Sequence, residues 1–281
     1  MELSAMELYH KTGDKKYLNQ ALEYGRREPM TPWMGADSAR HYQWYPFMNM
    51  GHYQMARSGN ERISKEFIRN LKSGIERTLE KAQSSPFLYG IPTVWCSNNL
   101  TTAMLTQCIL YRQLTGDHQF EEMEGSLRDW LLGCNPWGVS MIVELPLSGN
   151  YPHQPHSFII NEKLGNTTGG LVDGPVYATI FGSLKGVNMT GGTNYEEFQP
   201  GNMVYHDSTH DYSTNEPTMD GTASLTFPLS TYQEEGKAQT GATEDKNVYV
   251  NGGIIRTDPS KKRICLVFTA ADKADGAEMI I

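Results

Sequence analysis

The chain has 281 residues, of which 38% are hydrophobic and 20% are charged, so it can form a sizeable core, which argues against global disorder. With 24 basic and 32 acidic residues its formal net charge is -8, which argues against nucleic acid and anionic membranes as partners and suits a neutral substrate such as a polysaccharide. No apolar run approaches the roughly 18–20 residues that a membrane-spanning helix needs.

Three segments in the first half share one pattern, in which two stretches with apolar residues at helical spacing flank a Gly-Asp or Gly-Asn pair. They cover residues 8–25, 53–71 and 110–133. The glycine suits the left-handed position that ends one helix, and the Asp or Asn is expected to cap the next. The irregular spacing of Gly13, Gly59 and Gly116 argues against a short-period solenoid. The pattern therefore predicts a layered fold of helical hairpins.

The second half has a different composition. Residues 134–215 are rich in Gly, Pro, Asn, Thr and His, which predicts long loops that carry the chemistry. Helical spacing returns over 216–235, where Pro228 is expected to kink or end the helix. We predict a main domain, a polar linker and the truncated start of a further domain, over 1–235, 236–253 and 254–281. The run ICLVF in the last part is typical of a buried strand and predicts a short β-forming tail.

The sequence shows no signal peptide, starts inside a helical pattern and stops inside an apolar segment, so we expect it to be part of a longer chain. Its four cysteines are Cys96, Cys108, Cys134 and Cys265. None of them forms a C-x-x-C motif, which argues against a zinc or redox site and predicts buried free thiols, with one disulfide left open as an alternative.

The densest group of chemically active residues is YHDSTHDYSTNEPTMDGTAS at 205–224. Its carboxylates, set among aromatic residues and histidines, are Asp207, Asp211, Glu216 and Asp220. Sugar-cleaving sites need this combination, because aromatic faces stack on pyranose rings, one carboxyl protonates the leaving oxygen, and a second activates water or attacks the anomeric carbon. A solvated acidic loop or a calcium site has a similar composition, so composition leaves these alternatives open.

The spacing within this segment resembles the second signature of glycoside hydrolase family 9, in which fixed aromatic, Asp, aromatic, Glu and small residues follow one another. Those positions are occupied by Tyr205, Asp207, Tyr212, Glu216 and Thr218. Upstream, similar family segments match LLGCNPWGVSM (131–141), NYPHQPHSF (150–158) and GGLVDGPVY (169–177). The resemblance covers roughly residues 1–235. It implies an all-α fold that forms the C-terminal part of an (α/α)6 barrel, with long active-site loops.

The resemblance implies a secreted or periplasmic enzyme that cleaves β-1,4 or mixed-linkage glucan, such as cellulose, by an inverting reaction. Glu216 would be the general acid, Asp207 an orienting or charge-tuning carboxylate, and His156 a sugar ligand. Ser157 and Phe158 stand where many members of the family continue to an arginine. The general base of the family lies in an Asp-Ala-Gly-Asp motif, which this sequence lacks, so we expect the base in an N-terminal half outside it.

Four aromatic residues are candidates for substrate contact, namely Tyr212, Trp137, Trp95 and Tyr205. The Pro-Trp-Gly turn around Trp137 suggests an exposed ring that could form a sugar platform, and packing against neighbouring helices is the alternative for it. The alternative functions are an exo-acting β-glucosaminidase or other β-glycosidase of the same family, and a non-catalytic carbohydrate-binding fragment. We expect no cofactor, no catalytic metal and no nucleic-acid or membrane partner, and we leave a structural calcium ion open.

Overall fold

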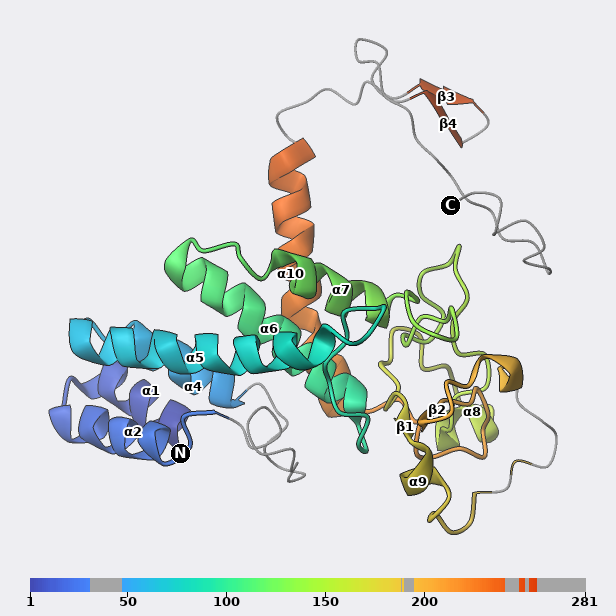
Figure 1. Cartoon of the computed structure of the whole chain (residues 1–281), viewed down its shortest axis with the longest axis horizontal. Helices are drawn as coiled ribbons and strands as arrows, with labels where there is room; N and C mark the ends of the chain where they lie inside the picture. The colour runs from blue at the N-terminus through green and yellow to red at the C-terminus, as the bar shows by residue number, and fades with distance from the viewer. Residues whose placement is uncertain (31–46, 188, 190–194, 241–247, 251–252, 257–281) are drawn as a thin grey trace. The chain divides into compact units, whose positions relative to one another are not determined.

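The computed structural model describes residues 1–30, 47–187, 189, 195–240, 248–250 and 253–256 (Figure 1). The chain divides into two compact units, Met1–Ser230 and Thr231–Ile281. The first unit is predominantly helical, which confirms the predicted all-α class. In the part of the chain that is described, no helix is both long enough and apolar enough to cross a membrane.

Six helices form three consecutive hairpins. They are α1 (Glu2–Thr12), α2 (Lys15–Arg27), α4 (Phe47–Ala56), α5 (Glu61–Ala82), α6 (Ser97–Thr115) and α7 (Glu121–Leu131). Gly13, Gly59 and Gly116 have φ angles of +69°, +79° and +69°, the left-handed conformation that glycine adopts without strain. Each glycine therefore reverses the chain between the paired helices, as the sequence pattern predicted.

The predicted N-caps hold for two of the three hairpins. Asp14 and Asn60 precede α2 and α5, and each side chain accepts the backbone N–H two positions on, at 2.9 and 3.1 Å. The prediction is wrong for Asp117, because α7 begins only after Phe120. Asp117 instead accepts a nearby backbone N–H at 3.0 Å and the Tyr111 hydroxyl at 2.8 Å, so its oxygens close the turn before α7.

Helix α6 is the central element of the first unit, since it is buried on all sides from Ser97 to Tyr111. Two of its buried hydroxyls are satisfied within the helix, because those of Thr101 and Thr102 donate to the carbonyls of Ser97 and Asn98, both at 2.9 Å, whereas the hydroxyl of Thr106 has no partner among the described residues. The N-terminal end of α6, which carries Ser97 and Asn98, points into the loop region described below.

The segment between α7 and α10 contains mostly loops, as predicted for 134–215. Its short elements are α8 (Phe158–Asn161), β1 (Val176–Tyr177), α9 (Ala178–Phe181), a 3-10 turn (Glu196–Phe198) and β2 (Met203–Val204). Strands β1 and β2 are antiparallel, with Val176 opposite Val204. Loops of this length need a fixed scaffold, which here is the N-terminal end of α6.

Helix α10 (Met219–Thr240) continues through Pro228, which corrects the alternative that this proline ends the helix. A proline inside a helix removes only one backbone donor. The helix also occupies the start of the predicted linker, where Lys, Ala and Gln favour helix. In the second unit, β3 (Val248–Val250) and β4 (Gly253–Arg256) form an antiparallel hairpin. The ICLVF run lies outside the described residues.

Candidate active site

The backbone at Glu216 is fixed by a chain of contacts that starts at α6. The Ser97 hydroxyl donates to the carbonyl of Pro175 at 2.7 Å, and the backbone N–H of Asn98 donates to the carbonyl of Asp173 at 2.9 Å. The N–H of Asp173 in turn donates to the carbonyl of Glu216 at 3.0 Å. The buried helix therefore sets the position of Glu216 through the 172–175 segment.

The side chain of Glu216 is exposed. Among the described residues, none donates a hydrogen bond to its carboxyl group. A rigid backbone with a free, solvent-facing carboxyl is the arrangement that a proton donor to an external ligand needs.

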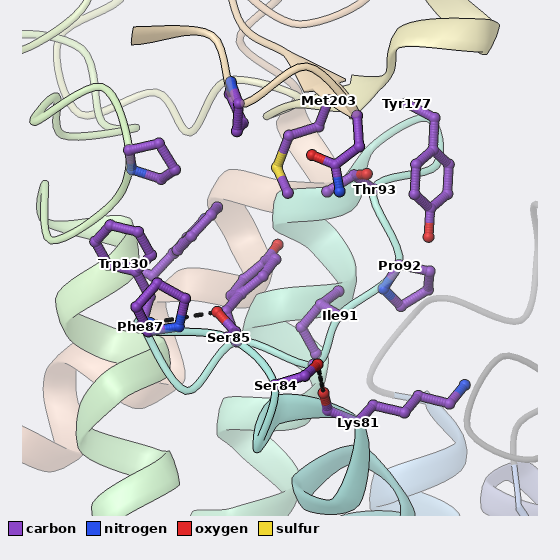
Figure 2. Close-up of a pocket in the computed structure, with 16 residues that line it drawn as sticks. Lys81, Ser84, Ser85, Phe87, Ile91, Pro92, Thr93, Trp130, Tyr177 and Met203 are labelled. Carbon is purple, nitrogen blue, oxygen red and sulfur yellow. Dashed lines mark hydrogen bonds between the residues drawn. The ribbon is translucent and has the colours of Figure 1, made fainter.

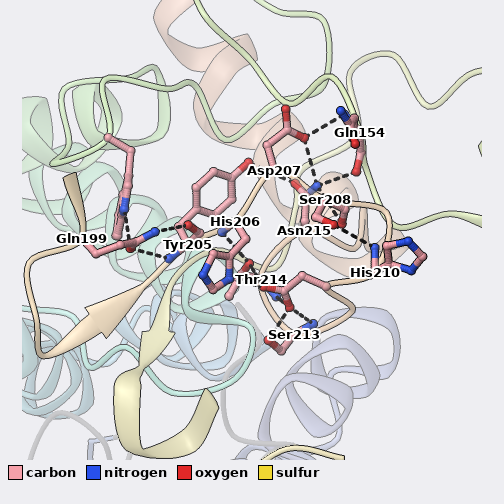
Figure 3. A network of polar contacts seen from close by, with 12 residues as sticks. Gln154, Gln199, Tyr205, His206, Asp207, Ser208, His210, Ser213, Thr214 and Asn215 are labelled. Carbon is pink, nitrogen blue, oxygen red and sulfur yellow. Dashed lines mark hydrogen bonds and ion pairs between the residues drawn. The ribbon is translucent and has the colours of Figure 1, made fainter. Parts of the chain in front are cut away.

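Asp207 has a different environment, because its side chain is only 3% exposed. Its two oxygens accept the backbone N–H groups of His153 and Gln154, both at 2.8 Å, and the amide of Asn215 at 3.1 Å (Figure 3). The two oxygens of Asp207 thus hold the loop that precedes His156 against the segment that precedes Glu216.

Asn215 joins the whole network and was not singled out in the sequence. Its amide also donates to the carbonyl of Gln154 at 2.8 Å, its side-chain oxygen accepts the Tyr205 hydroxyl at 3.0 Å, and its backbone carbonyl accepts the N–H of His156 at 2.9 Å (Figure 3). It is fully buried. The available signal was its place directly before Glu216 inside the matching motif.

Three of the predicted ligand-contacting residues lie together beside this segment. The rings of Trp95 and Tyr212 stack with centroids 5.7 Å apart, and the ring of His156 meets Tyr212 edge-on at 6.2 Å. All three side chains are half-buried. The ring nitrogen Nδ1 of His156 donates to the carbonyl of Thr209 at 2.6 Å, which leaves Nε2 as the ring nitrogen available to a ligand.

Two of the predicted substrate contacts are corrected by the structure. Trp137 and Tyr205 are 4% and 0% exposed, so neither can present a ring face to a ligand. The indole N–H of Trp137 donates to the side chain of Gln199 at 2.8 Å, and its ring packs against Tyr205 and Trp130. Both are core residues beneath the loops, where a large aromatic body and a satisfied polar tip are both stable.

Asp211 is a structural turn residue. It is fully buried and accepts hydrogen bonds from His206 at 2.8 Å and from the backbone and hydroxyl groups of Ser213 and Thr214 (Figure 3). Burial alone would raise the pKa of the Asp211 carboxyl, but the hydrogen bonds from His206, Ser213 and Thr214 outweigh it and hold that pKa below its ordinary value.

Asp173, which the sequence analysis did not single out, is the opposite case. It is 2% exposed, and its oxygen Oδ1 has no hydrogen-bond partner. Burial raises the pKa of the Asp173 carboxyl well above its ordinary value, against a hydrogen bond with Cys96, and the nearby carboxylates of Glu216 and Asp220 raise that pKa further. Burial and the neighbouring carboxylates thus both favour the protonated form of Asp173 beside the exposed Glu216.

Among the described residues, no group of three or more His, Cys, Asp and Glu side chains could hold a metal ion. Cys96 and Cys108 are buried free thiols, as predicted. Cys134 is free but exposed, which corrects the prediction for it, because it lies on the turn after α7 rather than within a helix. Cys265 lies outside the described residues.

Comparison with known proteins gives one family. The family model described as glycosyl hydrolase family 9 matches residues 1–229. None of the curated proteins matches the chain.

Several solved structures share the fold. A metagenome-derived glycoside hydrolase family 9 endoglucanase has a TM-score of 0.61 at 21% identity, and the match covers 81% of this chain and 39% of that one. AaCel9A in complex with cellobiose-like isofagomine has a TM-score of 0.57 at 18% identity, over 82% of this chain and 42% of that one. A Bacteroides ovatus family 9 protein has a TM-score of 0.56 at 20% identity, over 81% and 38%.

The chain thus spans less than half the length of the solved structures that it matches. The helical hairpins and the loop-borne motif nevertheless agree with one family over most of the chain, and the resemblance seen in the sequence is confirmed. The chain belongs to glycosyl hydrolase family 9.

Proposed function

We propose that this chain carries the acid side of an inverting glycoside hydrolase that cleaves β-1,4 or mixed-linkage glucan, with Glu216 as the general acid. One observation carries the proposal. Of the carboxylates in the matching motif, Asp207 and Asp211 are buried and occupied by hydrogen bonds, whereas Glu216 is exposed on a fixed backbone. Only an accessible carboxyl can deliver a proton to the glycosidic oxygen of a bound polymer.

The neighbouring residues have roles that follow from their contacts. The Trp95–Tyr212 pair offers an aromatic surface for the apolar face of a sugar ring, and Nε2 of His156 can accept a hydrogen bond from a sugar hydroxyl. Asp207 is a positioning residue, because its oxygens hold the His156 loop rather than face solvent. The general base is expected in a part of the enzyme outside this sequence, and the enzyme is proposed to be secreted or periplasmic.

The names of the structural relatives support the substrate class. One is described as an endoglucanase, and another was solved with a cellobiose-like isofagomine, which mimics a sugar. A net charge of -8 disfavours anionic substrates and suits a neutral glucan.

The test is reducing-sugar release from barley β-glucan and carboxymethylcellulose by the enzyme that contains this chain. Glu216→Gln is compared with Glu162→Gln, which alters another exposed glutamate. We expect turnover to disappear in the first variant and to persist in the second, with both folded. If Glu216→Gln retains activity, Glu216 is not the general acid. Viscosity that falls ahead of reducing-end release identifies endo cleavage and excludes the exo-acting glucosaminidase.

A non-catalytic carbohydrate-binding role is the second candidate, and the absence of the Asp-Ala-Gly-Asp motif favours it. Glucan binding without product, from the chain and from the longer enzyme alike, would establish that role.

A further inference from the structure

A second concave site lies apart from the Glu216 segment. It is a pocket of about 420 Å³ between the loop that follows α5, the C-terminal end of α7 and the β1–β2 pair (Figure 2). Neither Glu216 nor the Trp95–Tyr212 pair lines it. All of its lining residues belong to the first unit of the chain.

The pocket has a rigid aromatic base. The rings of Tyr89 and Trp130 stack at 3.6 Å with only 10° between their planes, and Phe87 meets Trp130 edge-on at 5.8 Å. Figure 2 shows Trp130 and Phe87 on one side of the pocket and Tyr177 on the other. Tyr177 is 37% exposed, so its ring is accessible to a ligand. The shape of the pocket is therefore set before any ligand arrives.

Two polar groups in the wall of this pocket are unsatisfied. The indole N–H of Trp130 and the hydroxyl of Thr93 belong to side chains that are each 1% exposed, and neither has a hydrogen-bond partner. Buried donors without a partner are rare in folded proteins and call for an explanation. The matched comparison is Trp137, whose buried indole N–H is satisfied by Gln199.

These features define the chemistry of the occupant. The Trp130 N–H lacks an acceptor, the Thr93 hydroxyl can donate or accept, and half of the other lining residues are aromatic or proline, beside polar ones such as Ser84, Ser85 and Asn202. A molecule with hydroxyl groups around apolar ring faces satisfies all of these. We propose that this pocket is a second carbohydrate site, which binds a short β-linked gluco-oligosaccharide separately from the Glu216 site; the choice of sugar rests on the proposed function.

The decisive measurement is the indole N–H region of the nuclear magnetic resonance spectrum of the ¹⁵N-labelled chain during titration with cellotriose. The Trp130 signal, assigned with Trp130→Phe, should shift because its N–H gains an acceptor, whereas the Trp137 signal should stay in place. The shift should persist in the Trp95→Ala/Tyr212→Ala variant, which disables the aromatic surface near Glu216. Calorimetry should give binding at least about tenfold weaker in Tyr177→Ala, the loss of one stacking contact.

A second variant separates binding from folding. Thr93→Val keeps the shape of the side chain and removes a hydroxyl that has no partner in the free protein, so we expect weaker cellotriose binding with no loss of thermal stability. Three results would overturn the proposal: no shift of the Trp130 signal, a shift of the Trp95 signal alone, or a response of Trp130 to inorganic phosphate and not to cellotriose. Glu216→Gln turnover is measured separately, so failure of the proposed hydrolysis leaves a positive Trp130 result intact.

Discussion

Removal of the Asp207 side chain tests whether this carboxylate organises the site or takes part in proton transfer. Asp207→Ala deprives three donors of their acceptor, the backbone N–H groups at 153 and 154 and the amide of Asn215. A buried donor left without a partner costs about 1–3 kcal/mol. The side chains of His153 and Gln154 are exposed, so water can reach their backbone and the cost is near 1 kcal/mol each, whereas Asn215 is fully buried. We expect a total loss of about 4 kcal/mol.

The assay is urea unfolding followed by tryptophan fluorescence, with the free energy of unfolding extrapolated to water. Asp207→Asn keeps the shape and one acceptor oxygen, so about half of the loss is expected there. Glu216→Gln is the matched control, because an exposed carboxyl without hydrogen bonds should change stability by less than about 0.5 kcal/mol. If Asp207→Ala unfolds at the same urea concentration as the unaltered chain, the positioning role is refuted.

Three other substitutions have expected outcomes that can be measured. The pKa of Asp173 is higher in the folded chain than in the unfolded chain, so the unfolded chain loses this proton at a lower pH. The free energy of unfolding should therefore fall as pH rises from about 4 towards the folded pKa, by up to about 1.4 kcal/mol per pH unit. Asp173→Asn should remove this pH dependence from melting curves. Glu124→Ala leaves the guanidinium of Arg112, whose side chain is 13% exposed and lies at 3.0 Å in the intact pair, without this carboxylate, and should cost about 3 kcal/mol in urea unfolding. Gly174→Ala should cost about 3 kcal/mol, because φ is +89° and the new methyl group would overlap the Asn98 side chain; a melting temperature equal to that of the parent would contradict this account.

The helical hairpins could be predicted from the sequence because their signals are local. A glycine with positive φ followed by an Asp or Asn cap depends on only a few neighbouring residues, as at Gly13 and Gly59. The exception shows the limit of this reasoning. Asp117 has the same sequence context, but the hydroxyl of Tyr111 near the end of α6 donates to its carboxyl group, and α7 starts later.

The site could be predicted only in part, because motif spacing gives positions along the chain and not burial. Spacing selected Asp207 and Glu216, but their environments differ because Asp207 contacts residues 53 and 54 positions away and the backbone of Glu216 contacts Asp173. Trp137 stands in a Pro-Trp-Gly turn that suggested exposure, yet Gln199, 62 positions on, covers its polar edge. No local pattern contains that information.

The carboxyl groups of this site are of two kinds: buried ones that hold segments of the chain together, and the exposed one of Glu216, which can reach a substrate. Among the described residues near Glu216, Asp207 and Asp211 have no Lys or Arg partner in their hydrogen bonds, and their carboxyl oxygens accept bonds from backbone, amide, hydroxyl and imidazole donors. Those donors come from segments that must stay close to Glu216, so each buried carboxyl group fixes geometry and is itself inaccessible to substrate. Asp173 has fewer donors, and burial raises the pKa of its carboxyl group well above the ordinary value. The carboxyl group of Glu216 makes no structural contact of this kind, because the contact to the 172–175 segment is made by the backbone of Glu216. It follows that substitutions at Asp207 and Asp211 should act first on folding, and substitutions of the Glu216 carboxyl on turnover alone.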